Sequence, residues 1–474
     1  MAMALAMRCN IRRRLALAAA RFFSVVKESS ANESSATAES TAIPSLSIDR
    51  SGLHVPEDYQ SPQIAETDME KQLKSIITFR GGPITVAEYM EEVLTNPSAG
   101  YYLHQEVFGA AGSFITSPDV SQMFGEMIGI WSVSLWEKMG KPRKLQLVEL
   151  GPGRGTLMQD LLRSTLTFKD FSKALSIHFV ECSPALRKQQ RRALQCPGEE
   201  KKHEGGDRPA VENSRSQRFE TNVSWYLDLK DVPRGVPTII IAQEFFDALP
   251  IHQFQKTPVG WCEKLIDVDS SGAFRFVLSS QPTAATLLYL KKRLNWITAV
   301  EEESIHHIEV CPKALQVSQE IAKRVAEDSG GGIIIDYGKD EPVTDSFQAI
   351  RNHEFVNVLD KPGTADLSAH VDFAAIKRMV AETASPTVST YGPIFQQEFL
   401  AMLGINVRLE ALVKDASDEQ GEKLQLGYWR LVGEGPPPWL SEGDDGYKIQ
   451  GMGKHYRVLA IADSKLGAPA CFRQ

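Results

Sequence analysis

The stretch that decides the expected fold is Leu147-Val148-Glu149-Leu150-Gly151-Pro152-Gly153-Arg154-Gly155-Thr156. Residues 145–150 form a short apolar run that predicts a buried strand, and residues 156–163 follow with a helical pattern. Glycines at 151, 153 and 155 have no Cβ, which permits a sharp turn and lets a ligand approach free N–H groups at the helix start. The stretch therefore predicts a ligand-binding strand–turn–helix unit, although a tight turn without a ligand would use the same glycines.

The spacing of these glycines indicates which ligand the turn binds. The dinucleotide fingerprint is GxGxxG, whereas here the third glycine comes one residue early and Thr156 follows it. Glu149, two residues before Gly151, would suit a ligand that carries an ammonium group and a sulfonium but no pyrophosphate. We therefore expect S-adenosylmethionine rather than NAD, held by Glu149, Gly151, Gly153 and Gly155. The alternative for Glu149 is a cap at a helix terminus.

A second acidic residue supports a nucleoside ligand. Glu181 follows the predicted strand 177–180, and a carboxylate at that place accepts both hydroxyls of a ribose. Glu181 alone does not separate S-adenosylmethionine from NAD, since both contain an adenosine ribose. Trp225 either stacks on adenine or lies in the core, and we favour the core.

The third motif, residues 239–250, contains the candidate catalytic residues Glu244 and Asp247. The strand 238–242 is followed by a helix-like segment, 245–249, so we expect both carboxylates on one helical face. A guanidinium acceptor needs carboxylates that accept two of its N–H groups at once, in bidentate hydrogen bonds. Because methyl transfer is an in-line displacement, the enzyme mainly has to align the reacting atoms. For Asp247 the alternative is an ordinary charge at a helix start.

Strand and helix patterns alternate through the centre of the chain, which predicts an α/β fold with a doubly wound, Rossmann-like sheet. Further elements are a helix at 312–327 and a strand at 333–335, preceded by three glycines at 330–332. Residues 197–218 predict a solvated insertion and residues 261–278 a hairpin, while residues 96–119 predict an ordered loop over the site. We expect N-terminal helices and this loop at 65–140, a donor-binding core at 141–255, a hairpin and helical insertion for substrate at 256–330, and the rest of the catalytic domain at 331–474.

Charge is distributed unevenly along the 474 residues. Residues 1–27 contain six Lys and Arg and no Asp or Glu, which is typical of an organelle transit peptide. Residues 28–47 are rich in Ser, Ala, Thr and Glu and are expected to be disordered. Removing six positive charges from the net −8 leaves −14 for residues 28–474. We therefore expect residues 1–50 to be a mitochondrial leader with its linker, and the rest to bind no nucleic acid.

The sequence carries no pattern for a metal site or a membrane span. Its six cysteines form no CxxC pair, and its ten histidines include no HExxH motif. No stretch after the leader reaches the roughly 18 apolar residues that a membrane helix needs. We accordingly expect no metal and no transmembrane segment.

Taken in order, the motifs resemble those of the MidA-type mitochondrial complex I assembly factors, which are class I S-adenosylmethionine-dependent protein arginine methyltransferases. The resemblance extends from about residue 65 to 460. The residues that carry it lie at 100–102, 114–118, 124–126, 149–157, 181–186, 244–250, 335–338, 363–373, 397–400 and 403–405.

This resemblance implies symmetric dimethylation of an arginine on a hydrophilic, quinone-site subunit of complex I, in the mitochondrial matrix. Two positions depart from the family pattern. Ser113 stands where the family usually has Asp, and Gln243 stands where Asn or His is more common. A non-catalytic assembly chaperone on the same scaffold is therefore the alternative, whereas an NAD oxidoreductase would need the GxGxxG motif.

Overall fold

The computed structural model describes residues 66–104, 116–197, 212–442, 444 and 449–473. The predicted leader and linker at 1–50, Ser113 and most of the predicted insertion at 197–218 lie outside the described residues. Thr67–Gln474 forms one unit. The finer division of the chain at residues 140, 255 and 330 stays a prediction.

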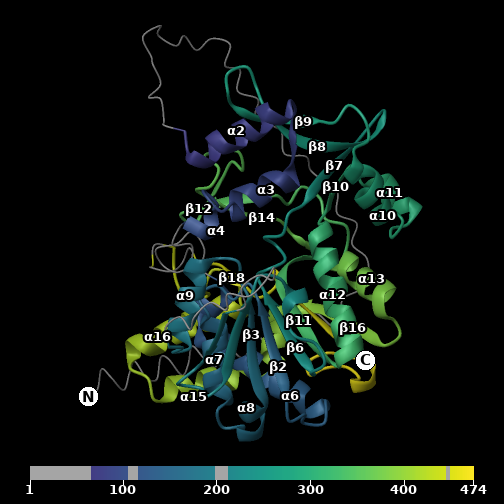
Figure 1. Cartoon of the computed structure of the whole chain (residues 1–474). Helices are drawn as coiled ribbons and strands as arrows, with labels where there is room; N and C mark the ends of the chain where they lie inside the picture. Colours follow the sequence, from purple (N-terminus) through teal and green to yellow (C-terminus); the bar gives the residue numbers. More distant parts are fainter. Residues whose placement is uncertain (1–65, 105–115, 198–211, 443, 445–448, 474) are drawn as a thin grey trace, which may run out of the picture. The chain divides into compact units, whose positions relative to one another are not determined.

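The largest sheet of the described residues has nine strands, whose order confirms the doubly wound fold (Figure 1). The chain enters at the central strand β2, adds β3 and β5 on one side, and returns to add β6 and β11 on the other. These five strands are parallel. Because the order reverses between β2 and β6, their carboxyl ends frame the crevice where ligands bind in such sheets. The strands are β2 (Leu145–Leu150), β3 (Leu175–Val180), β4 (Glu212–Arg215), β5 (Asn222–Tyr226), β6 (Thr238–Gln243), β11 (Gly330–Lys339), β15 (Val371–Asp372), β16 (Val388–Phe395) and β19 (Tyr456–Asp463).

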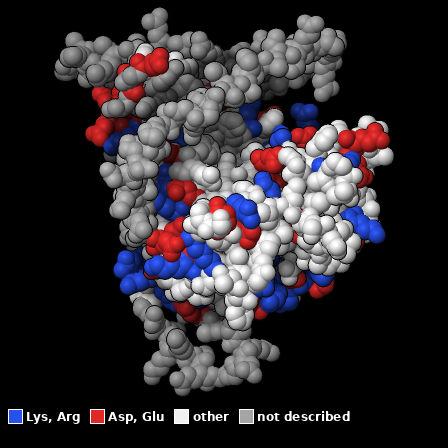
Figure 2. All heavy atoms as spheres, turned by 90° about the horizontal axis from the view of Figure 1, so that it is seen from above, with Lys and Arg blue, Asp and Glu red and all other residues white. Residues whose placement is uncertain are grey.

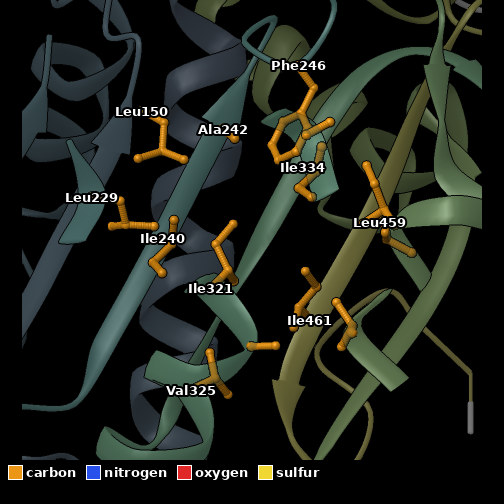
Figure 3. Packing of buried hydrophobic residues seen from close by; sticks show 14 of the residues in the cluster. Leu150, Leu229, Ile240, Ala242, Phe246, Ile321, Val325, Ile334, Leu459 and Ile461 are labelled. Carbon is orange, nitrogen blue, oxygen red and sulfur yellow. The ribbon is translucent and has the colours of Figure 1, made fainter. Parts of the chain in front are cut away.

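The central strands are buried on both faces, as their apolar runs predict. Every residue of β2 and β6 is buried. Alternate residues of the strands, such as Val148, Ile240 and Ile334, pack against Ile321 and Val325 of a long helix, α12 (Figure 3). This core fixes the strand ends, and with them the loops at the carboxyl edge.

The helices around this sheet include the predicted ones. The helix that follows the glycine turn, α7, packs against α6. Another, α9, follows β3, and α12 packs against α13. The helices are α5 (Ser117–Val120), α6 (Gln122–Lys138), α7 (Thr156–Thr165), α8 (Lys169–Ala174), α9 (Pro184–Ala193), η1 (Leu229–Asp231), α12 (Pro312–Asp328), α13 (Phe373–Ala384), α14 (Gln396–Met402), α15 (Ile405–Lys414), α16 (Asp418–Val432) and η3 (Ser464–Leu466).

A second sheet has five strands: one from the N-terminal segment, two from the predicted hairpin, and two more at 252–257 and 307–310. A capping box of Thr85 with Glu88 begins α3. The side chains of α2 and α3 share one apolar cluster with Ile266 of the hairpin. The elements are α2 (Asp68–Arg80), β1 (Ile84–Thr85), α3 (Val86–Thr95), α4 (Tyr101–His104), β7 (His252–Thr257), β8 (Gly260–Val268), β9 (Phe274–Leu278), η2 (Thr286–Leu290), α10 (Lys291–Leu294), α11 (Ala299–Ser304) and β10 (His307–Val310).

The remaining strands are short. β12, β13 and β14 form a three-stranded sheet, and β17 pairs with β18. Their bounds are β12 (Gln348–Arg351), β13 (Glu354–Val356), β14 (Asp366–Ser368), β17 (Glu434–Gly435) and β18 (Gly451–Met452).

Three sequence predictions are wrong in detail. Residues 245–249 form a turn and no helix. The glycines at 330–332 belong to β11 itself. Glycine is needed at 330 because a Cβ there would lie 2.0 Å from the Thr238 carbonyl oxygen of β6. Residues 212–215, placed in the solvated insertion, instead form β4, which pairs with β5.

The surface of the described residues carries both signs of charge. Lys and Arg side chains lie among Asp and Glu on the face seen in Figure 2. None of the helices in the described ranges is long and apolar enough to cross a membrane.

Candidate active site

The predicted glycine turn lies at the carboxyl end of β2. Gly151, Gly153 and Gly155 all have positive φ angles, of 62°, 51° and 83°. A Cβ on Gly151 would lie 2.8 Å from the Phe245 ring, and one on Gly155 would lie 3.3 Å from the Cα of Gln190. Since L side chains rarely adopt such φ values, the backbone of this turn requires glycine.

The carboxylate of Glu149 lies at the same cavity as the glycine turn, and one of its oxygens has no hydrogen-bond partner among the described residues. Its side chain is buried, and its Oε2 has no hydrogen-bond partner among the described residues. Burial, and next the charge of Glu181, raise the pKa of Glu149 to about 8. Glu149 lines a cavity together with Gly151, Gly153, Gln243 and Glu244. A buried carboxylate is stable when a cation or donor pairs with it, so the unpaired oxygen suits the ammonium group of a ligand. The alternative of a helix cap is not seen, because no N–H of α7 donates to Glu149.

Glu181 lies directly after β3, at the same edge of the sheet. Its carboxylate accepts hydrogen bonds from the Ser183 N–H at 2.8 Å and from Gln190 Nε2 at 3.1 Å. Burial raises the pKa of Glu181 to about 7. The structure thus brings together the five residues predicted for the donor: Glu149, Gly151, Gly153, Gly155 and Glu181.

Trp225 belongs to the core, as we favoured. It is fully buried in β5, and its ring packs near Phe179. Its indole nitrogen donates to Gln190 Oε1 at 2.8 Å. Sequence reasoning missed Gln190, although a glutamine on the buried face of a helix is itself a signal that its amide has a partner.

Glu244 lies at the carboxyl end of β6 in a left-handed conformation, with φ of 48°. Three donors hold its carboxylate: the Ser117 N–H at 2.9 Å, Gln243 Nε2 at 2.7 Å and the Tyr456 hydroxyl at 3.2 Å. Burial raises the pKa of Glu244 to about 7. Left-handed non-glycine residues cost energy and concentrate at functional sites. The other atom of the Gln243 amide, Oε1, is buried without a partner among the described residues.

Asp247 lies near Glu244, but not on a shared helical face as predicted. The turn at 245–249 is fixed instead by Asp336 of β11, which accepts the N–H groups of Phe246 and Asp247. Burial, and next the charge of Asp366, raise the pKa of Asp247 to about 7. Burial, and next the charges of Asp247 and Glu244, raise the pKa of Asp336 as well.

Asp366 is the fourth acidic residue of this region, and three tyrosines lie beside these carboxylates. Asp366 accepts a hydrogen bond from the Tyr102 hydroxyl at 2.7 Å, and burial raises its pKa to about 7. The rings of Tyr337 and Tyr456 contact each other edge to face. We define the acidic cluster as Glu244, Asp247, Asp336 and Asp366. At low pH the acidic cluster is neutral. At high pH its carboxylates are ionised and repel one another, so a bound cation would stabilise the cluster.

The end of the predicted covering loop lies at the same cavity. Thr116, Pro118 and Asp119 line it. Asp119 accepts hydrogen bonds from Arg154 Nη2 at 2.7 Å and from the Thr156 hydroxyl at 3.2 Å. These contacts tie the loop to the glycine turn, while residues 105–115 lie outside the described residues.

Two polar residues of the family-like segment 363–373 have structural partners. Asp372 caps α13 through the Ala375 N–H and forms an ion pair with Arg293. The His370 ring contacts Tyr337 edge to face. No group of three His, Cys, Asp or Glu side chains in the described ranges is arranged to hold a metal ion.

Comparison with known proteins identifies a matching family. Residues 127–394 match the model of a family described as S-adenosyl-L-methionine-dependent methyltransferases. The chain is similar to proteins named "Protein arginine methyltransferase NDUFAF7, mitochondrial". It is 45% identical to the Mus musculus protein over 355 residues, 74% of this chain and 78% of that one. It is 43% identical to the Homo sapiens protein over 357 residues, 74% and 77% of the two chains. The Drosophila melanogaster homolog is 40% identical over 385 residues, 80% and 84% of the two chains.

Solved structures share the fold. A protein from Burkholderia thailandensis, crystallised with bound S-adenosyl-homocysteine, matches with a TM-score of 0.65 and 21% identity over 86% of this chain and 95% of that one. This likeness confirms the predicted α/β architecture.

Proposed function

The chain belongs to the family of S-adenosyl-L-methionine-dependent methyltransferases, and from this premise we propose that it is a mitochondrial protein arginine methyltransferase. We further propose that it acts in the matrix, forms symmetric dimethylarginine on a hydrophilic, quinone-site subunit of complex I, and so supports assembly of that complex. The observation that carries the proposal is one cavity lined both by Glu149, with its unpaired oxygen, and by Glu244, held by three donors.

The residues at the glycine turn fit the methyl donor. Bound there, S-adenosylmethionine supplies an electrophilic methyl group on a positively charged sulfur. The Glu149 Oε2 atom would accept the donor's ammonium, and Glu181 would accept its ribose hydroxyls. Gly151, Gly153 and Gly155 leave space along the backbone.

Donor binding requires a local rearrangement. The cavity measures about 50 Å³, whereas pockets for small molecules usually measure about 300–1,000 Å³. Thr116, Pro118 and Asp119 line the cavity, and the Phe245 ring lies against Gly151, which also lines it. We expect one of these to move when the donor binds.

The acidic cluster fits a guanidinium acceptor. Ionised Glu244 and Asp247 would each accept N–H groups of the arginine side chain and orient one nitrogen towards the methyl carbon. The donor would supply the methyl group and, in its sulfur, the leaving group that keeps the electron pair, while Glu244 and Asp247 would hold the accepting nitrogen in line with it. The nitrogen then loses a proton, which Glu244 accepts, because its pKa of about 7 makes it a stronger base than an ordinary carboxylate.

Two further observations support the cellular role. The acid-free leader at 1–27 suits an imported protein, and the relatives that match over about three quarters of this chain are named mitochondrial. The net charge of −14 on residues 28–474 suits a cationic substrate.

The complex I substrate can be tested in cells that lack this protein. We expect mass spectrometry of their complex I subunits to find an arginine that has lost symmetric dimethylation. Re-expression of the wild-type chain should restore it, whereas a Glu244→Gln variant that accumulates to the same level should not. If complex I from the deleted cells carries all its methylated arginines, this substrate is wrong. If the Glu244 variant restores complex I assembly fully, the protein acts as a non-catalytic chaperone.

A further inference from the structure

The buried face of α9 is polar and directed to Glu181. The buried residues of this helix are Leu186, Arg187 and Gln190, and two of the three carry side chains that need hydrogen-bond partners. Arg187 Nε donates to the backbone carbonyl of Glu181 at 2.9 Å. Gln190 donates to the Glu181 carboxylate. One helix therefore binds both the backbone carbonyl and the side-chain carboxylate of Glu181.

The amide of Gln190 has only one orientation that satisfies its neighbours. The indole N–H of Trp225 can only donate, so the atom it contacts at 2.8 Å must be the Gln190 oxygen. The amide nitrogen then faces two acceptors, the Gly153 carbonyl at 2.7 Å and Glu181 Oε2 at 3.1 Å. Both N–H groups of Gln190 and its oxygen are therefore used, in a site that excludes solvent.

These contacts fix the plane of the Glu181 carboxylate. Oε1 receives the Ser183 N–H and Oε2 receives the Gln190 amide, and the Cys182 N–H also donates to this carboxylate. Two carboxylate oxygens with two lone pairs each can accept more than these three donors. The fixed plane therefore sets the direction in which the carboxylate would accept a ribose hydroxyl.

We infer that Gln190, oriented by Trp225, is a positioning residue that fixes the Glu181 carboxylate and the Gly153 carbonyl so that the site selects ligands with an intact ribose diol. The inference rests on the donor site of the proposed function. Gln190 acts through Glu181 and Gly153 and does not touch the reacting atoms. A Trp–Gln pair that merely filled the core would contribute to stability without affecting which ribose is bound.

Titration calorimetry with two ligands separates these roles. The ligands are S-adenosylhomocysteine and its 2′-deoxyribose analogue. The wild-type protein should prefer the first by about 10- to 100-fold, as expected for a hydrogen bond to a charged acceptor. In Gln190→Met, which keeps the side-chain length but donates no hydrogen bond, the preference should fall to about threefold or less.

Trp225→Phe provides a second, milder variant. Phenylalanine keeps a ring under Arg191, which lies 4.3 Å from the centre of the indole ring, but leaves the Gln190 oxygen without its donor. The amide is then held by its two acceptors alone, and the ribose preference should fall between the values of wild type and Gln190→Met.

Gln396→Met is the matched control. Gln396 is also fully buried and donates from Nε2, at 2.9 Å, to the backbone carbonyl of Leu431. This variant should lose thermal stability and keep the wild-type ribose preference.

The outcomes separate this inference from the proposed function. If wild type does not bind S-adenosylhomocysteine, the donor site itself is wrong. If wild type binds it with the expected preference and Gln190→Met keeps that preference, the positioning role is wrong. Should Gln190→Met fail to fold, an unchanged preference in Trp225→Phe overturns the inference, and a reduced one supports it.

Discussion

Replacing Glu244 by glutamine is expected to lower kcat for methyl transfer to arginine by about 10²- to 10⁴-fold, the range for loss of a general base. The amide keeps the shape of the side chain, but it cannot carry the negative charge that pairs with a guanidinium or take up its proton. Affinity for S-adenosylhomocysteine should stay unchanged, because Glu149 and Glu181 rather than Glu244 are proposed to hold that ligand. Single-turnover transfer of labelled methyl and calorimetry measure the two quantities.

The wild-type rate should also depend on pH through the same carboxylates. Burial raises the pKa values of Glu244, Asp247 and Asp366 to about 7, and each group accepts a cation or a proton only when ionised. Carboxylates ionise above their pKa, so kcat/KM for the arginine substrate, measured with saturating donor, should be lost as the pH falls through 7 and should reach a plateau above it.

Glu309→Gln is the control for the loss of a buried carboxylate. Glu309 lies in β10 of the second sheet and also accepts several hydrogen bonds, from Gln253, Ser346 and Phe347. Its replacement should reduce stability and leave kcat of the folded protein unchanged. Wild-type kcat in the Glu244 variant would contradict the role of Glu244 as proton acceptor.

Replacing Gly153 by valine is expected to weaken donor binding by about 100-fold or more, which corresponds to about 2.7 kcal/mol, because valine would shift the backbone of the turn and occupy space that the ligand needs. The φ of Gly153 is 51°, which a β-branched residue rarely adopts. The branched side chain would also enter the cavity that Gly153 lines. Calorimetry with S-adenosylhomocysteine measures the change.

Gly235→Val is the control for backbone strain at a glycine that does not line the cavity. Gly235 also has a positive φ, of 85°, and a Cβ there would meet no atom within 4 Å. This variant should lose stability for the same backbone reason and bind the donor product as wild type does. If Gly153→Val bound with unchanged affinity, the donor site would have to lie elsewhere.

Signals between residues close in sequence predicted much of the fold and pointed to the donor side of the candidate site. The strand, turn and helix at 145–165 depend on residues within a few positions of each other. The apolar runs of β2 and β6 likewise indicate burial on both faces without any knowledge of their partners. For the same reason the glycine turn and Glu149 could be assigned to one ligand.

Contacts between distant residues account for what was missed. Trp225 bonds Gln190 across 35 positions, and Tyr456 bonds Glu244 across 212. The helix expected at 245–249 does not form, because Asp336 takes the N–H groups of Phe246 and Asp247 from 90 and 89 positions away. A single sequence contains no signal that pairs residues so far apart. The contacts of Glu244 with Tyr456, and of the turn with Asp336, could therefore be identified only in the folded chain.

The most direct measurement is transfer of a labelled methyl group by the purified protein. S-adenosylmethionine with a labelled methyl would be incubated with the protein and an extract of mitochondria that lack it, and the labelled residues identified by mass spectrometry. We predict label on arginine, as symmetric dimethylarginine in a complex I subunit, and no label with the Glu244→Gln variant. Binding of S-adenosylhomocysteine without label on any arginine would contradict the account.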